Sequence, residues 1–135
     1  MRGQILVQIG RREDAASIWE RATKWWPSVA TYWLERAWNC NHLRRFDEAV
    51  SCFDAALKVE PANREVALRK ASVLDRAGKH EQALAILQAE LSDRRFLDEI
   101  REKGEKEFDY LISRESSPDF IELLKSAFRT KGAGA

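Results

Sequence analysis

The sequence predicts an all-α fold, a solenoid (α-α superhelix) of stacked helix pairs. The main observation is a recurrence every 34 residues, because a fixed period of this length is typical of repeat arrays. Apolar residues also recur three and four positions apart, as they do on one face of a helix. No stretch alternates apolar and polar residues, so no strand is predicted. The recurring positions are Gly3, Ala37 and Ala71; Leu6, Cys40 and Leu74; Ala15, Ala49 and Ala83; Trp19, Phe53 and Leu87; and Pro27 and Pro61.

The first two predicted helices cover residues 14–25 and 29–42. Each carries an apolar stripe at helical spacing. Pro27 separates them, because proline does not continue a helix, and Ser28 is suited to cap the second one. The stripe of the first helix consists of Ala15, Ile18, Trp19 and Ala22.

Three further helices are predicted over residues 46–59, 64–77 and 80–91. Pro61 ends the first of these, and Asn63 is suited to cap the second. Gly78 closes the second, because glycine adopts the left-handed conformation that commonly ends a helix. Small and large residues alternate on the stripes, as in Ala49 and Phe53, which allows helices to approach closely where they cross.

The composition fits one domain with an ordinary core and excludes several classes of function. The chain has 135 residues, of which 44% are hydrophobic, and a formal net charge of +1. This balance provides no general attraction to nucleic acid or to an anionic membrane, so neither partner is expected. No apolar run has the length of a signal-peptide core or of a membrane span. We therefore expect a cytoplasmic protein.

The residues that often carry chemistry do not form a recognisable motif. Cys40 and Cys52 are the only cysteines, and both lie in apolar surroundings on predicted helices. We interpret them as reduced, buried side chains, with a disulfide or a metal pair as the alternative. His42 and His80 stand too far from other ligand types to complete a metal site. Since phosphate loops and nucleophile elbows are also missing from the sequence, we predict no enzyme, no metal and no cofactor.

Residues 30–63 resemble the tetratricopeptide repeat (TPR), a pair of antiparallel helices. Trp33, Ala37 and Cys40 take the aromatic, glycine and tyrosine positions of the first helix. The positions of the second helix are taken by Phe46, Ala49, Phe53, Ala56 and Pro61. The resemblance implies an array of about two and a half repeats over residues 1–97. Its parts are a truncated repeat at 1–29, a full repeat at 30–63 and a degenerate repeat at 64–97.

Several residues depart from the family pattern. Arg44 stands where the neighbouring repeats have Gly10 and Gly78, so a turn with positive φ at this position would strain the arginine. Glu90 and Arg95 replace the second alanine and the proline, which makes the third repeat degenerate. The first repeat begins inside its first helix and is expected to turn at Gly10, so an apolar flank is expected at that end.

The 34-residue pattern ends at residue 97. Residues 98–130 resemble the helical cap that closes many bacterial TPR arrays, with a docking helix for another chain as the alternative. Ser117 and Pro118 form a favourable helix start, with serine as the cap and proline in the first turn. The apolar stripe that follows consists of Phe120, Ile121, Leu123, Leu124 and Phe128. Residues 131–135 are read as a disordered tail.

The resemblance implies a concave, partner-binding groove lined by the first helix of each repeat. The corresponding residues are Gln4, Val7 and Gln8; Leu34, Trp38, Asn41 and His42; and Leu68, Ser72, Asp75 and Arg76. Some TPR domains hold a C-terminal carboxylate with a clamp of lysine, asparagine and arginine residues. Of the clamp positions only Arg69 fits, because the others carry Leu34, Glu35, Trp38 and Glu65. We therefore expect an amphipathic helix or an extended peptide as the ligand.

The tryptophans divide into packing and binding candidates. Trp38 lies one step off the packing stripe, so we interpret it as a groove residue, with packing against the neighbouring repeat as the alternative. At least one of Trp25 and Trp26 is expected to be buried. The aromatic residues assigned to the core are Trp19, Trp33 and Phe53.

The predicted function is protein–protein interaction, as a module or scaffold that binds a peptide or helix of a protein partner without catalysis. One alternative is a structural domain that forms homo-oligomers through its exposed end repeats. Another is an RNA-processing scaffold, because Ala16–Ala22 followed by Pro27, Tyr32 and Trp33 resembles a half-a-TPR repeat.

Overall fold

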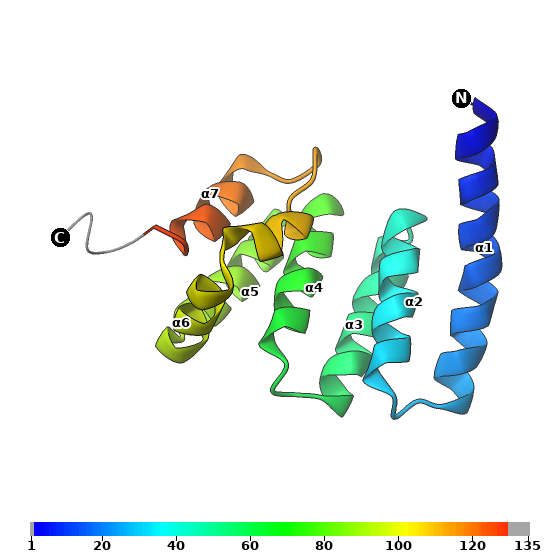
Figure 1. Ribbon diagram of the computed structural model, residues 1–135, viewed down its shortest axis with the longest axis horizontal. Helices are drawn as coiled ribbons and strands as arrows, with labels where there is room; N and C mark the ends of the chain where they lie inside the picture. Colours follow the sequence, from blue (N-terminus) through cyan, green and yellow to red (C-terminus); the bar gives the residue numbers. More distant parts are fainter. Residues whose placement is uncertain (1, 130–135) are drawn as a thin grey trace. The chain divides into compact units, whose positions relative to one another are not determined.

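The computed structural model describes the backbone of residues 2–129 and the side chains from Gly10 to Arg129. Within this range the chain is helical and contains no strand, which confirms the predicted all-α class. The tail predicted at 131–135 lies outside the described residues. The elements are α1 (Arg2–Trp25), α2 (Ala30–His42), α3 (Phe46–Val59), α4 (Arg64–Arg76), α5 (His80–Leu91), α6 (Arg94–Lys103), the 3-10 helix η1 (Glu105–Leu111) and α7 (Pro118–Ser126) (Figure 1).

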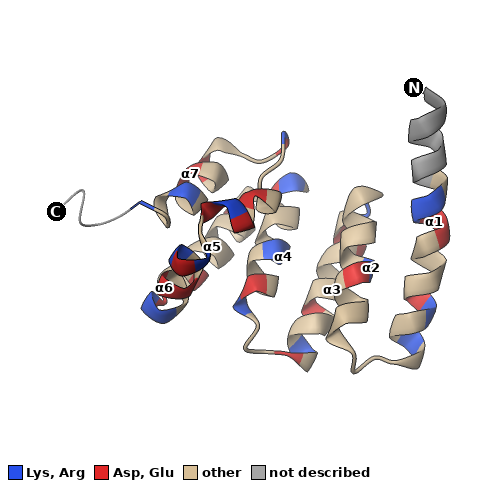
Figure 2. Ribbon diagram, viewed as in Figure 1, with Lys and Arg blue, Asp and Glu red and all other residues tan. Residues whose placement is uncertain are grey.

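The chain forms two compact units, one ending at Val66 and the other beginning at Ala67. The first unit contains α1, α2 and α3, and the second contains most of α4 and all later elements. Acidic and basic residues are interspersed along the helices of both units (Figure 2). No helix in the described part of the chain is both long and apolar enough to span a bilayer.

In the first unit α2 packs against both α1 and α3. Ala37 on α2 and Ala49 on α3 are fully buried, as is the large side chain of Phe53. Small residues at such positions let the two backbones approach, while a large neighbour fills the remaining space. Two polar contacts join α1 to α2: the Asn39 side chain donates to the Arg12 carbonyl at 2.8 Å, and the Arg36 guanidinium donates to the Thr23 hydroxyl at 3.0 Å.

The expected turn at Gly10 is wrong, because α1 runs without a break through this residue. Gly10 is not among the residues with positive φ, and no atom lies within 4 Å of the position where a Cβ would stand. A single glycine costs a helix about 1 kcal/mol relative to alanine. That cost is too small to break a helix whose flanking residues favour the helical conformation.

The expected strain at Arg44 is confirmed. Arg44 has φ of 62° and is the non-glycine residue with positive φ in the described chain, while Gly78 has φ of 88°. The hydrogen bonds at the two turns also correspond. The Arg45 N–H donates to the Cys40 carbonyl at 2.8 Å, and the Lys79 N–H donates to the Leu74 carbonyl at 2.9 Å. Both are the six-residue closure of a Schellman helix end, so the same turn recurs one repeat later with arginine in place of glycine.

The predicted helix caps meet different outcomes. Ser28 does not cap α2, because the helix begins one residue later than expected and Val29, which has no side-chain acceptor, holds the cap position. Ser117 does cap α7: its hydroxyl accepts a hydrogen bond from the Phe120 N–H at 3.2 Å, and Pro118 begins the helix. Asp93 caps α6 in the same way.

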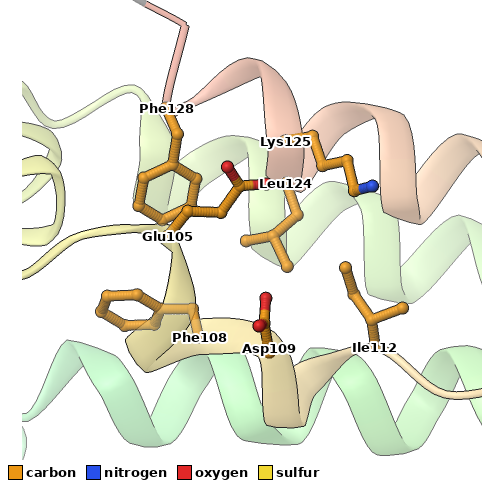
Figure 3. A pocket seen from close by; sticks show the side chains of 7 residues that line it. All are labelled: Glu105, Phe108, Asp109, Ile112, Leu124, Lys125 and Phe128. Atoms are coloured by element: carbon orange, nitrogen blue, oxygen red, sulfur yellow. The ribbon is translucent and has the colours of Figure 1, made fainter.

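The second unit has a core formed by α5, α6, η1 and α7, in which α7 packs against α5. Phe108 of η1 faces Phe128, which follows α7, with ring centroids 5.7 Å apart, and Leu124 lies beside them (Figure 3). The Arg101 guanidinium donates to the Ala127 carbonyl at 2.5 Å, just after the last residue of α7. The fully buried side chains of this core include Leu87, Ile100, Phe108, Leu111, Phe120 and Leu124.

The expectation that Trp25 or Trp26 is buried is also wrong. Trp25 is 71% exposed and Trp26 is 58% exposed, and Ile18, about two helical turns before Trp25 on α1, is 61% exposed. Trp26 contacts Tyr32 edge-on, with ring centroids 6.2 Å apart. This one-sided contact leaves most of the indole in solvent. Phe53, assigned to the core, is completely buried, whereas Trp19 and Trp33 are half-buried.

Candidate partner-binding surfaces on α2 and α4

In the first unit, α2 presents Leu34, Trp38 and His42 on one face, because residues four apart in a helix lie above one another. Leu34 and Trp38 are half-buried and His42 is exposed. The Trp38 ring meets the buried Phe53 ring edge-on, with centroids 6.0 Å apart. The centroid of the Trp38 ring also lies 6.3 Å from that of the His42 ring. The indole is therefore held in place by α3 while part of its surface remains in solvent.

The other groove residues predicted in the first unit are placed differently. Asn41 is 2% exposed and belongs to the interior of the unit. Gln4, Val7 and Gln8 lie on the first turns of α1, and their side chains are outside the described residues. The structure therefore brings together Leu34, Trp38 and His42, and it separates Asn41 from their surface.

In the second unit, the groove residues predicted on α4 are covered by the chain's own C-terminal part. Leu68, Ser72 and Asp75 are buried, and Arg76 is half-buried. The Ser72 hydroxyl donates to the Leu111 carbonyl at 2.5 Å. The expectation that these side chains line an open surface thus differs from the structure, since residues 110–117 lie against this face of α4.

Polar contacts fix this segment along α4. The Arg69 side chain donates to the Tyr110 hydroxyl at 3.1 Å, and its guanidinium also lies 5.1 Å from the centre of the Tyr110 ring. Farther along the helix, Arg76 lies 3.6 Å from the Glu115 carboxylate. These contacts complement the bond between Ser72 and Leu111 and follow the helical spacing of three and four residues on α4.

Asp75 is the most buried of the acidic groups at this contact, with a side chain that is 0% exposed. Its carboxylate accepts hydrogen bonds from the Ser117 N–H at 2.7 Å and from the Ser117 hydroxyl at 2.8 Å. His80 Nδ1 lies 2.6 Å from the same carboxylate. In a hydrolase triad the histidine lies between the acid and the serine. Here the acid lies between the other two, and the serine hydroxyl is engaged in capping α7, so the arrangement is that of a structural contact.

A second polar cluster lies between α2 and α3. The Cys40 thiol donates to the Glu48 carboxylate at 3.1 Å, and Arg36 lies 3.6 Å from that carboxylate. Cys40 and Cys52 are 1% and 2% exposed and carry free thiols, which agrees with the prediction of reduced, buried cysteines. A hydrogen bond to Cys52, burial and the nearby Glu48 charge all raise the pKa of Cys40. The hydrogen bond from Cys40 lowers the pKa of Cys52 and outweighs its burial.

The residues that join α4 to the C-terminal segment were not all recognisable in the sequence. Ser117 was identified as a helix cap, but its bond to Asp75 was not. Tyr110 and Glu115 were not predicted to take part in any site. These contacts join residues about 40 positions apart, as in the pairs Arg69–Tyr110 and Asp75–Ser117, so no local spacing marks them. Among the described residues, no group of three or more histidine, cysteine or acidic side chains is placed to bind a metal.

Comparison with known families agrees with the repeat pattern. Residues 1–49 and 42–96 each match the family model described as tetratricopeptide repeat. The two matches span residues 1–96, which is more than half of the chain. No curated protein matches the chain. Tetratricopeptide repeats generally serve as protein-interaction modules. The helix pairs, the recurring turns and the family match together show that this chain belongs to the tetratricopeptide repeat family.

Proposed function

We propose that this protein is a non-catalytic interaction module that binds a peptide or helical segment of a protein partner on the α2 face formed by Leu34, Trp38 and His42. The observation that supports this proposal best is the packing of Trp38. A large aromatic side chain that is already ordered loses little conformational freedom on binding, which is the property of an interface hot spot. Gln4, Val7 and Gln8 are proposed to extend this surface along α1.

The polar clusters support a binding function over a catalytic one. The Asp75 carboxylate and the Ser117 hydroxyl form hydrogen bonds that hold the start of α7. The Cys40 thiol is buried and its raised pKa keeps it protonated at neutral pH, whereas a nucleophilic cysteine requires the thiolate. These groups are therefore suited to stabilising the helix pairs.

We propose the repeat boundaries that the sequence suggested, at 1–29, 30–63 and 64–97, with residues 98–130 as a helical cap. The cap is supported by the packing of α7 against α5 and by the Ser117–Asp75 contact. Arg76 is proposed to belong to the partner-binding side of the third repeat. It is half-buried, while Leu68, Ser72 and Asp75 are buried.

Partner capture from a cell lysate tests the proposed surface. The Trp38→Ala variant should lose captured proteins that the parent retains, while its circular dichroism shows unchanged helix content. Trp26→Ala is the matched control, because Trp26 is 58% exposed and lies outside the proposed surface. If the Trp38→Ala variant folds and captures the same proteins as the parent, the proposed surface on α2 is disproved.

Self-association is a second candidate function, favoured by the apolar side chains that α1 exposes. Ile18 and Trp25 are seven residues apart, so they share one face of the helix, and they are 61% and 71% exposed. Exposed apolar groups that share a face often mark an interface. Light scattering at increasing concentration tests this candidate. A parent that dimerises and an Ile18→Glu variant that stays monomeric support it, whereas a parent that stays monomeric at high concentration excludes it.

A further inference from the structure

The contact between α4 and residues 110–117 has the features of a peptide in a binding site. Arg69, Ser72 and Arg76 lie three and four residues apart, so they form one face of α4. Each of them meets a different part of the segment: the Tyr110 side chain, the Leu111 carbonyl and the Glu115 carboxylate. The segment is thus recognised at intervals along its length.

Much of this recognition is directed at the backbone of the segment. The Ser72 hydroxyl binds the Leu111 carbonyl, and the Asp75 carboxylate binds the Ser117 N–H. The segment is not extended throughout: Tyr110 and Leu111 end the 3-10 helix, and the Ser116 N–H donates to the Ser113 carbonyl at 3.1 Å, which closes a turn. Every peptide presents such carbonyl and N–H groups. The same α4 side chains are therefore able to bind a segment of another chain that turns in the same way.

The side chains of the segment add specificity at two positions. Tyr110 meets the Arg69 guanidinium through both its hydroxyl and its ring, and Glu115 pairs with Arg76. Tyr110 remains 40% exposed, and Glu115 is exposed as well. The core of the second unit instead holds Phe108 and Leu111, which are fully buried. Leu111 belongs to the same segment, so displacing the segment also takes this buried side chain out of the core.

The position of this face within the repeat links it to partner binding. Leu68, Ser72 and Arg76 stand 34 residues after Leu34, Trp38 and His42. The segment therefore covers, in the third repeat, the positions that carry the proposed binding surface in the second.

We propose that residues 110–117 are an intramolecular ligand of α4. A partner peptide that turns in the same way, with an aromatic residue, an apolar residue directly after it and an acidic residue five positions after the aromatic one, binds the same α4 face by displacing them. This inference rests on the proposed function, in which the first helix of a repeat binds a partner, and it identifies the chemistry of one ligand. A tethered segment has an effective concentration of about millimolar, so it weakens the binding of any peptide added in solution.

The test uses the full-length chain and a fluorescently labelled synthetic peptide with the sequence of residues 105–118. The double variant Tyr110→Ala and Glu115→Ala weakens the tethered segment and leaves every α4 side chain intact. Fluorescence anisotropy should show that the labelled peptide binds this variant about tenfold more tightly than the parent, since the internal competitor has lost two contacts. Arg114→Ala is the matched control, because Arg114 is an exposed residue of the same segment and should leave the affinity unchanged.

A further substitution identifies the receptor face. Arg69→Ala, added to the double variant, should return the peptide affinity toward that of the parent, because the tyrosine of the peptide loses its partner. If the folded double variant binds the peptide no more tightly than the parent, or if Arg69→Ala leaves the gain intact, the proposal is overturned. Should the double variant lose its helical signal, Tyr110→Ala alone replaces it, with an expected gain of roughly threefold; no gain in that variant has the same meaning.

The outcome is independent of the test of the α2 surface. Trp38→Ala leaves α4 and the segment unchanged, so it should not alter the affinity for the labelled peptide. If Trp38→Ala abolishes partner capture while the peptide fails to bind the double variant, the proposed function stands and this inference fails. If Trp38→Ala leaves partner capture intact while the labelled peptide binds the double variant more tightly, the α2 surface is rejected and the α4 ligand is retained.

Discussion

The carboxylate of Asp75, at the end of α4, accepts hydrogen bonds from both the N–H and the hydroxyl of Ser117, at 2.7 and 2.8 Å. The Ser117 hydroxyl at the same time accepts a hydrogen bond from the first turn of α7. The buried Asp75 side chain thus fixes the start of α7 to the end of α4, 42 residues earlier in the chain. A buried carboxylate whose oxygens are all engaged stabilises such a contact, and the loss of either partner leaves an unsatisfied group.

The first prediction concerns this contact. Asp75→Ala should lower the free energy of unfolding by about 2–4 kcal/mol, because it leaves the Ser117 N–H and hydroxyl without their buried acceptor. Urea unfolding followed by circular dichroism measures the change. Asp98→Ala is the control, since Asp98 is an exposed residue of α6 and its replacement should change the stability by less than about 0.5 kcal/mol.

A double-mutant cycle with Ser117→Ala separates the contact from the helix cap. Ser117→Ala alone should cost about 1–2 kcal/mol, because it removes the cap but keeps the backbone bond to Asp75. The two substitutions together should cost less than the sum of their separate effects. Strict additivity would mean that the two residues do not stabilise each other.

The second prediction compares two glycines. Gly10→Ala should stabilise the protein by about 1 kcal/mol, because Gly10 lies inside α1 and alanine favours the helix. Gly78→Ala should destabilise it by about 1 kcal/mol, because Gly78 has φ of 88°, a conformation that a Cβ disfavours. Thermal or urea unfolding of the two variants gives the signs.

Steric overlap does not complicate this comparison, because no atom lies within 4 Å of the Cβ position at either glycine. The opposite signs would therefore reflect backbone conformation alone. A destabilising effect of Gly10→Ala would indicate a turn at residue 10 like the turns at Arg44 and Gly78, in place of a continuous α1.

The third prediction concerns the strained arginine. With φ of 62° at position 44, Arg44→Gly should be more stable than Arg44→Ala by about 1 kcal/mol. Both substitutions remove the contact of the arginine with the Phe46 ring, so their difference isolates the backbone term. At Lys58, an exposed residue within α3, the order should reverse, with glycine less stable than alanine by about 1 kcal/mol. Equal stability of the two variants at position 44 would contradict strain there.

The turns are predictable from the sequence because equivalent positions of successive repeats can be compared with each other. Arg44 aligns with Gly78 at 34 residues, and glycine at that position indicates a helix end with positive φ, which both residues adopt. The same alignment failed at Gly10. The repeat pattern shows that a glycine at this position is compatible with a turn. A glycine is also compatible with a continuous helix, at a cost of about 1 kcal/mol.

The candidate site was less predictable than the fold, and the contrast between Trp38 and Ser72 shows why. Both occupy the same position of consecutive repeats, and from the sequence both were expected in an open groove. Trp38 is half-buried, while Ser72 is 4% exposed because its hydroxyl binds the Leu111 carbonyl. Every residue has a backbone carbonyl, so the residue type at position 111 does not indicate that this carbonyl accepts a hydrogen bond from Ser72. Periodicity identifies the face of a helix, but it does not identify the distant segment that covers this face.

The fourth prediction concerns pH and the buried thiols. The folded state raises the pKa of Cys40 above its ordinary value of 9.0. Cys40 therefore keeps its proton in the folded protein while the unfolded chain loses it, so stability should fall as the pH rises above about 9. The slope contributed by this one group is about 1.4 kcal/mol per pH unit. The folded state lowers the pKa of Cys52, so above about pH 9 this thiol is ionised in both the folded and the unfolded chain. Cys52 therefore adds no slope in this range.

Urea unfolding between pH 9 and pH 11, as an approximate range set by the ordinary cysteine pKa, measures this effect. Tyrosine and lysine residues also titrate in this range, and the two thiols influence each other, so the double variant Cys40→Ala and Cys52→Ala provides the reference. The parent should lose stability faster than this double variant as the pH rises, by the equivalent of one proton. Parallel curves for the two proteins would show that Cys40 ionises as easily in the folded state as in the unfolded chain. The hydrogen bond to Cys52, the burial of the thiol and the Glu48 carboxylate would then not hold its proton.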